Sequence, residues 1–185
     1  MMAPAHRRCY RCAGSRQAGH ACWSTTAPID STTTVFLDSG PLRRSLATAT
    51  RYAAADSWRA LAAMLARQYL LREGSETFVY AVPLARRAQR TQACDQRKLL
   101  ATTFAALLTL PVGPTLPYRL RRHQTTGRTG AKRLSGCHVV LVTDVIHTGQ
   151  SVWAAAQLFR DEASKSIDVV AITRRGEEPL GPLIG

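Results

Sequence analysis

The stretch that decides the fold is residues 139–151, with the sequence VVLVTDVIHTGQS. Its first four residues are branched and apolar, which is typical of a strand buried on both faces inside a parallel sheet. Asp144 follows at the end of that run, and a short loop with Thr148 and Gly149 leads into an amphipathic helix that opens at Ser151. This order predicts a strand–loop–helix unit with a carboxylate at the carboxyl end of the strand.

Such an end of a strand suits a sugar phosphate. In open α/β sheets, ligands bind at the carboxyl ends of the strands. A helix N-terminus offers free backbone N–H groups and the positive end of a dipole to a phosphate. We therefore expect Asp144 to bind sugar hydroxyls and the loop at 148–151 to bind the phosphate. A motif this short leaves open an ordinary turn between a strand and a helix, without a ligand.

The rest of the chain supplies the other elements of an α/β domain. Apolar and β-branched runs predict strands at 32–37, 77–84 and 167–173. Apolar residues at helical spacing predict helices within 42–72 and at 95–110 and 151–163. We expect Asp56 and Ser57 to cap the second helix within 42–72. The alternation of strands and helices indicates a Rossmann-like parallel sheet flanked by helices.

The N-terminal segment carries a possible metal site. The pair Cys9-x-x-Cys12 is half of a tetrahedral zinc site, because two thiolates on one tight turn point at a common centre. The candidates for the other two ligands are Cys22, with His20 or His6. A second Cys-x-x-Cys pair is incomplete, so a degenerate knuckle that binds no metal is an equal alternative.

Length and charge bound the remaining choices. With 185 residues, the chain has the length of one α/β domain with a small appendage: we expect a degenerate zinc-ribbon-like segment at 1–26, a domain at 27–176 and a loose tail at 177–185. The net charge of +13 suits a polyphosphate or DNA, although an arginine bias from genome base composition explains it equally well. No long apolar run and no apolar segment after the basic start are present, so we expect a cytoplasmic protein without membrane insertion.

In their order along the chain, these features resemble the ComF (competence protein F) family, which is related to GntX. Four stretches carry the resemblance: the cysteines at 9–22, the Gly-Pro-Leu-Arg segment at 40–43 with the helical residues after it, Val-Pro-Leu at 82–84 with the arginines that follow, and 139–151. The resemblance implies a small structural Zn²⁺ ribbon followed by a type I phosphoribosyltransferase fold. It also implies that the stretch 139–151 binds phosphoribosyl pyrophosphate (PRPP).

The same resemblance assigns roles to individual residues. Asp144 is the expected catalytic residue, Arg86 and Arg87 are expected to meet the pyrophosphate, and Mg²⁺ is expected to accompany PRPP. The expected PRPP-binding residues are Thr143, Asp144, His147, Thr148, Gly149, Gln150 and Ser151. The implied activity is a glycosyltransferase reaction of nucleoside metabolism, in which phosphoribosyl passes to an acceptor that the sequence does not name.

The chain departs from the family pattern at three places. The first of two expected acids is Thr143, only Gln96 remains of the Arg-Gly-Phe-Asn-Gln segment, and the polar loop at 124–133 is short. These departures indicate a divergent member with reduced transferase activity. They also leave open a non-catalytic protein that senses PRPP or a nucleotide, or that assists DNA uptake through its basic surface, with DNA or competence-machinery proteins as partners.

The zinc prediction has a direct test. If the site forms, the purified chain should carry about one zinc ion, and Cys12→Ser should lose it, because a structural zinc site depends on its full ligand set. Elemental analysis measures both proteins, and Cys94→Ser, which changes an isolated cysteine, should retain the metal. A wild-type chain without zinc would identify a degenerate knuckle.

Overall fold

The computed structural model describes residues 28–37, 40–52, 54–69, 76–83, 95–114 and 134–174. The predicted zinc segment at 1–26 and the tail at 177–185 lie outside these residues. The elements, in chain order, are β1 (Ser31–Leu37), α1 (Gly40–Arg51), α2 (Ala55–Gln68), β2 (Thr77–Ala81), α4 (Gln96–Leu107), β3 (His138–Ile146), α5 (Gln150–Asp161) and β4 (Ser166–Arg174).

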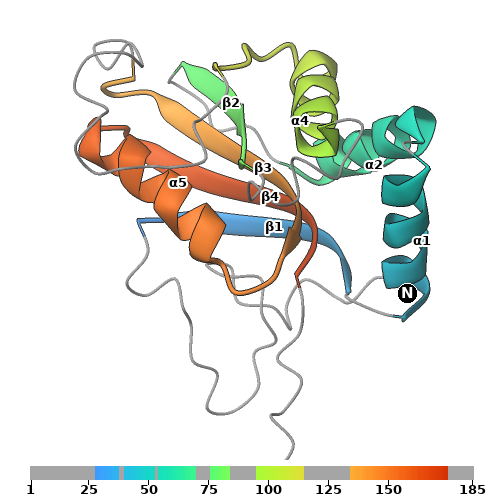
Figure 1. Ribbon diagram of the computed structural model, residues 1–185. Coiled ribbons are helices and arrows are strands. Elements are labelled where there is room, and N and C mark those ends of the chain that lie inside the picture. Colours follow the sequence, from blue (N-terminus) through green and yellow to red (C-terminus); the bar gives the residue numbers. More distant parts are fainter. Residues whose placement is uncertain are drawn as a thin grey trace, which may run out of the picture.

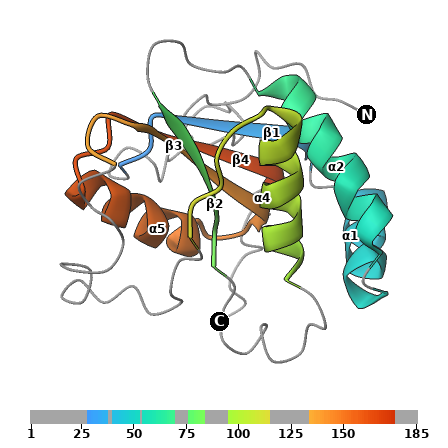
Figure 2. The same ribbon diagram turned by 90° about the horizontal axis from the view of Figure 1, so that it is seen from above.

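The four described strands form one parallel sheet in the order β1-β4-β3-β2. Helix α5 lies on one face of the sheet, and α2 and α4 lie on the other (Figure 1). Seen from above, α4 runs alongside β2, with α2 next to it (Figure 2). The predicted α/β architecture, a parallel sheet flanked by helices, is confirmed.

Strand β3 connects the two halves of the core. The side chains of its first apolar run are fully buried and point alternately to the two faces of the sheet. Val140 and Val142 belong to the core under α2 and α4, which contains Leu65 and Phe104. Val139 and Leu141 belong to the core under α5. A strand with two apolar faces requires a helix layer on each side, and this requirement explains the three-layer arrangement.

Two differences between the predicted and the observed elements concern acidic residues. Strand β3 continues past the four apolar residues to Ile146, so Asp144 lies inside the strand and not after it. The predicted cap of α2 is wrong: the helix already begins at Ala55, and Asp56 lies in its first turn, where it accepts a hydrogen bond from Arg59. An acidic side chain in the first turn stabilises the helix dipole there without acting as the cap.

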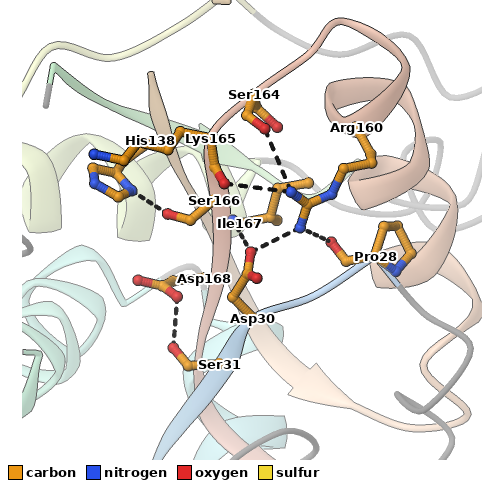
Figure 3. Close-up of polar contacts among 10 residues, drawn as sticks. All are labelled: Pro28, Asp30, Ser31, His138, Arg160, Ser164, Lys165, Ser166, Ile167 and Asp168. Carbon is orange, nitrogen blue, oxygen red and sulfur yellow. Dashed lines mark hydrogen bonds and ion pairs between the residues drawn. The ribbon is translucent and has the colours of Figure 1, made fainter. Parts of the chain in front are cut away.

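Polar side chains join the amino ends of the strands (Figure 3). Asp30, just before β1, accepts hydrogen bonds at Oδ2 from Arg160 Nη2 at 2.8 Å and from the backbone N–H of Ile167 at 2.7 Å. The guanidinium of Arg160 also donates to three backbone carbonyl oxygens, those of Pro28, Ser164 and Lys165. This arginine therefore ties the C-terminal turn of α5 to the start of β1.

A second polar group lies at the same end of the sheet. Asp168 of β4 is buried and accepts hydrogen bonds from Ser31 Oγ at 2.6 Å and from the Tyr69 hydroxyl at 3.1 Å. His138 Nδ1 and Ser166 Oγ form a hydrogen bond between β3 and β4 (Figure 3). Because a buried carboxylate is costly unless it is hydrogen-bonded, Asp168 holds β1 and α2 against β4.

None of the helices in the described ranges is long and apolar enough to cross a membrane.

The two-sided core predicts different costs for one substitution at two sites. Leu65→Ala in the centre of α2 should lower the free energy of unfolding by about 2–5 kcal/mol, because it leaves a cavity under the sheet. Leu107→Ala at the end of α4, where the leucine is 53% exposed, should cost about 0.5 kcal/mol or less. Urea unfolding of both variants measures the difference, and equal costs would contradict the described core.

Candidate functional site

The candidate site lies at the carboxyl end of β3. Asp144 falls on the same side of the strand as Val140 and Val142, so its side chain points toward the layer of α2 and α4 and not toward α5. The carboxylate is 21% exposed. It is thus partly covered by protein, with one side open to a ligand.

Arg97 in the first turn of α4 is the partner of this carboxylate. Its Nε donates to Asp144 Oδ1 at 2.7 Å, and its Nη1 donates to the backbone carbonyl of Pro83 at 3.1 Å. The arginine side chain is 14% exposed. Because Pro83 follows β2 and Asp144 lies near the carboxyl end of β3, the guanidinium bridges two neighbouring strands at the carboxyl edge of the sheet.

The position of Arg97 follows from how α4 begins. Asp95 is the N-cap, and its side chain accepts a hydrogen bond from the backbone N–H of Lys98 at 3.1 Å. A capping side chain of this kind fixes the first turn of a helix. In a parallel sheet, the helix after a strand starts at the carboxyl edge, so the cap delivers Arg97 to the end of β3.

Thr143 stands where the family pattern predicts a second acid. Its side chain is buried, and its Oγ1 donates to Asp144 Oδ1 at 3.2 Å. Oδ1 therefore has two donors. The other carboxylate oxygen, Oδ2, has no hydrogen-bond partner within the described part of the chain. Oδ2 is thus the oxygen of Asp144 that the described residues leave unused.

The loop between β3 and α5 has the form of an anion site. Gly149 is the N-cap of α5 and has φ +78° and ψ −8°, a left-handed conformation that favours glycine. The backbone N–H of Gln150 lies 3.5 Å from Thr148 Oγ1, a long contact that leaves this N–H available to a stronger acceptor. The first turn of α5 holds no acidic residue that would neutralise the dipole.

The structure brings together only part of the predicted site. Thr143 and Asp144 touch each other, and the loop residues 147–151 follow directly in the same turn between strand and helix. His147 is exposed and makes no polar contact with a described residue. The other predicted residues lie outside the described part of the chain: Arg86 and Arg87 for pyrophosphate, and Cys9, Cys12, His20 and Cys22 for zinc.

Arg97 is the residue that the sequence prediction missed. Gln96, the preceding residue, matches one position of the family pattern, but Arg97 is not part of any motif that the sequence showed. A topological signal was present: α4 follows β2, β2 was predicted as a strand, and the first turn of such a helix lies at the carboxyl edge. The pairing of β2 with β3, which brings that edge to Asp144, could not be read from the chain.

The described residues fit a magnesium ion poorly. Mg²⁺ is usually held by one or two carboxylates together with water and phosphate oxygens. Of the described carboxylates at this end of the sheet, Asp144 already has a guanidinium 2.7 Å away, and Asp95 caps α4. No group of three acidic, histidine or cysteine residues in the described ranges could hold a metal ion. The expected Mg²⁺ thus finds no prepared set of ligands among them.

Comparison with known proteins gives similarity of fold only. No protein-family model and no curated protein sequence matches the chain. Among solved structures it is similar to a glutamine PRPP amidotransferase from B. subtilis complexed with ADP and GMP (15% identity, TM-score 0.44, covering 64% of this chain and 26% of that one). It is also similar to a hypoxanthine-guanine-xanthine phosphoribosyltransferase (18%, 0.39, 65% and 61%) and to an orotate phosphoribosyltransferase from Aeropyrum pernix (20%, 0.37, 71% and 76%).

The neighbours thus include phosphoribosyltransferases. The chain spans about a quarter of the amidotransferase and less than two thirds of the hypoxanthine-guanine-xanthine enzyme. With TM-scores below 0.5 and identities of 20% or less, these similarities assign no activity to it.

The partly covered Arg97–Asp144 pair should be energetically coupled. A double-mutant cycle with Arg97→Gln and Asp144→Asn should give a coupling free energy of about 1–2 kcal/mol, because the pair is charged and shielded from water. The exposed Arg59–Asp56 pair in α2, with Nη1 and Oδ1 2.8 Å apart, is the control and should give about 0.5 kcal/mol or less. Chemical denaturation measures both cycles; a coupling no larger than that of the control would contradict the described pair.

Proposed function

We propose that this chain is a phosphoribosyltransferase-like protein that binds PRPP or a related sugar phosphate at residues 139–151. One observation carries the proposal. The carboxylate of Asp144 is partly covered, and the described residues leave its Oδ2 unused. One short loop later, α5 begins with a left-handed glycine and has no acid in its first turn. A hydroxyl acceptor followed along the chain by a helix N-terminus suits the two ends of a ribose phosphate.

Each part of the site has a separate task in this proposal. Asp144 Oδ2 accepts a hydrogen bond from a ribose hydroxyl. The backbone N–H groups at Gly149, Gln150 and Ser151 hold the phosphate, and the Thr148 and Ser151 hydroxyls supply further donors. Thr143 keeps Asp144 in place through its hydrogen bond to Oδ1 but adds no charge.

A transfer reaction at this site needs orientation and positive charge, and no nucleophile from the protein. The acceptor forms a bond to the anomeric carbon of PRPP, the bond from that carbon to pyrophosphate breaks, and the pyrophosphate leaves with the electron pair. Groups aimed at the departing charge lower the barrier. Because the described residues fit Mg²⁺ poorly, we assign the stabilisation of the negative charge on the departing pyrophosphate to the protein's own cations. Arg86 and Arg87 remain the proposed pyrophosphate ligands.

We further propose that the chain belongs to the ComF family. Its support is the order of the stretches at 9–22, 40–43, 82–84 and 139–151 in the sequence. The zinc-ribbon segment, with Cys9, Cys12, His20 and Cys22 as ligands, belongs to this proposal.

A second candidate is a non-catalytic protein that senses PRPP or a nucleotide, or that assists DNA uptake. The replacement of an acid by the buried Thr143 favours it, because a neutral side chain cannot replace a carboxylate next to ribose. The net charge of +13 suits contact with DNA phosphates. Release of pyrophosphate from PRPP in the presence of candidate acceptors separates the two: turnover supports the enzyme, and binding without turnover supports the sensor.

Calorimetric titration of PRPP tests the site with a matched pair of variants. Gly149→Ala should weaken binding by about tenfold or more, because the left-handed turn that presents the amides is disturbed. Gly136→Ala is the control: this glycine has nearly the same φ, +77°, and open space around an added Cβ, but it precedes β3 at the opposite edge of the sheet. It should lose a similar amount of stability and bind PRPP as the wild type does.

Asp144→Asn should also weaken binding, since the carboxylate acceptor becomes an amide. Equal affinity in the wild type, Gly149→Ala and Asp144→Asn would place the ligand elsewhere. No binding of PRPP to the folded wild type would overturn the proposed function.

A further inference from the structure

The Arg97–Asp144 pair adds a cation to the proposed site. We infer that Arg97 supplies the positive charge for the sugar phosphate, so that the site binds a pentose phosphate without a divalent cation. Asp144 and Arg97 then both hydrogen-bond to the ligand, the carboxylate as acceptor and the guanidinium as donor. This inference rests on the proposed function and specifies the ligand chemistry of the same site.

The first step is the charge balance. Asp144 contributes one negative charge, Arg97 cancels it at a distance of 2.7 Å, and Thr143 is neutral where a second acid is expected. The N-terminus of α5 adds a positive dipole with no acid in its first turn. The Asp144–Arg97 pair is therefore neutral in sum, and the dipole of α5 adds a positive end that favours an anion.

The second step is the donor count of Arg97. A guanidinium has five N–H groups, and Arg97 donates one to Asp144 and one to the Pro83 carbonyl. Its remaining N–H groups have no partner among the described residues. A ribose hydroxyl can donate to Asp144 Oδ2 and accept from this guanidinium, and a phosphate oxygen can accept from it as well.

The fold contains an internal comparison at the opposite edge of the sheet. The Arg160–Asp30 pair has nearly the same length, 2.8 Å, but Arg160 also donates to three backbone carbonyls, and Asp30 also accepts from the backbone N–H of Ile167 (Figure 3). That pair is occupied by the backbone and serves the fold. Among the described residues, Arg97 has one backbone partner, the Pro83 carbonyl, and its remaining donors are the ones we assign to the ligand.

The third step concerns the geometry that Mg²⁺ would need. A cation at Asp144 Oδ1 would have to replace both Arg97 Nε and Thr143 Oγ1. A cation at Oδ2 would bind the same carboxylate that the guanidinium already neutralises, and it would be repelled by that guanidinium. A further acid at position 143 would give a cation a second carboxylate ligand, and Thr143 has a neutral hydroxyl there. An arginine in contact with the anion is the simpler solution for this donor set.

Ribose 5-phosphate is the appropriate probe, because it has no pyrophosphate to chelate Mg²⁺. It should bind the full wild-type chain with the same affinity, within about twofold, in excess EDTA and in excess Mg²⁺. Arg97→Gln should weaken binding in EDTA by about tenfold or more, since a charge-assisted contact is lost. Mg²⁺ should recover part of this loss in the variant, because Asp144 is then free of its guanidinium.

Two further variants control for charge and folding. Lys98→Gln removes a positive charge from the neighbouring exposed position of α4 and should leave the affinity unchanged. Arg97→Lys keeps the charge without the fork of donors and should bind between the wild type and Arg97→Gln. Should Arg97→Gln fail to fold, the EDTA and Mg²⁺ arms with wild type and Arg97→Lys still decide the question.

The outcomes separate the two proposals. Binding of ribose 5-phosphate only in the presence of Mg²⁺, or wild-type affinity in Arg97→Gln, overturns the role of Arg97 and leaves the proposed function standing. Absence of binding of both ribose 5-phosphate and PRPP to the folded wild type, with and without Mg²⁺, overturns the proposed function itself.

Discussion

The burial of β3 on both faces is the constraint on which the rest of the structure depends. Val140 and Val142 must be covered by α2 and α4, and Val139 and Leu141 by α5, so the helices are distributed to both sides of the sheet. The same alternation places Asp144 toward α4. A polar group on a strand with two covered faces needs a partner, and the helix on that side supplies one in Arg97.

Each edge of the sheet has an arginine–aspartate pair, and the two pairs serve different purposes. At the amino edge, Arg160 and Asp30 are bound to backbone groups of Pro28 before β1, of β4 and of the turn after α5, and they hold these segments together (Figure 3). At the carboxyl edge, Arg97 and Asp144 keep donors and an acceptor that the described residues do not use. The pair at the amino edge stabilises the sheet, and the pair at the carboxyl edge is the one that we propose to contact a ligand.

The sequence predicted the elements that follow from hydrophobic periodicity and from turn residues. It did not predict the features that depend on which strands and helices lie side by side. The run of branched residues at 139–142 predicted β3, and the Thr-Gly loop predicted the start of α5 to within one residue. The length of β3 beyond Val142 depends on pairing with β4, which continues to Arg174. The N-cap of α2 was misplaced because Asp56 suits both a cap and a first turn. Arg97 was missed because its role comes from strand order, which the chain does not display.

The central claim is that the carboxyl end of β3 and the start of α5 form a sugar-phosphate site. Backbone amide NMR during titration with ribose 5-phosphate tests it most directly, since it reports each N–H group separately. The account predicts saturable shifts at Gly149, Gln150 and Ser151 and at the Arg97 side chain, with His138 and Ser166 at the other edge unchanged. Shifts confined to the amino edge, or no shifts at saturating ligand, would contradict it.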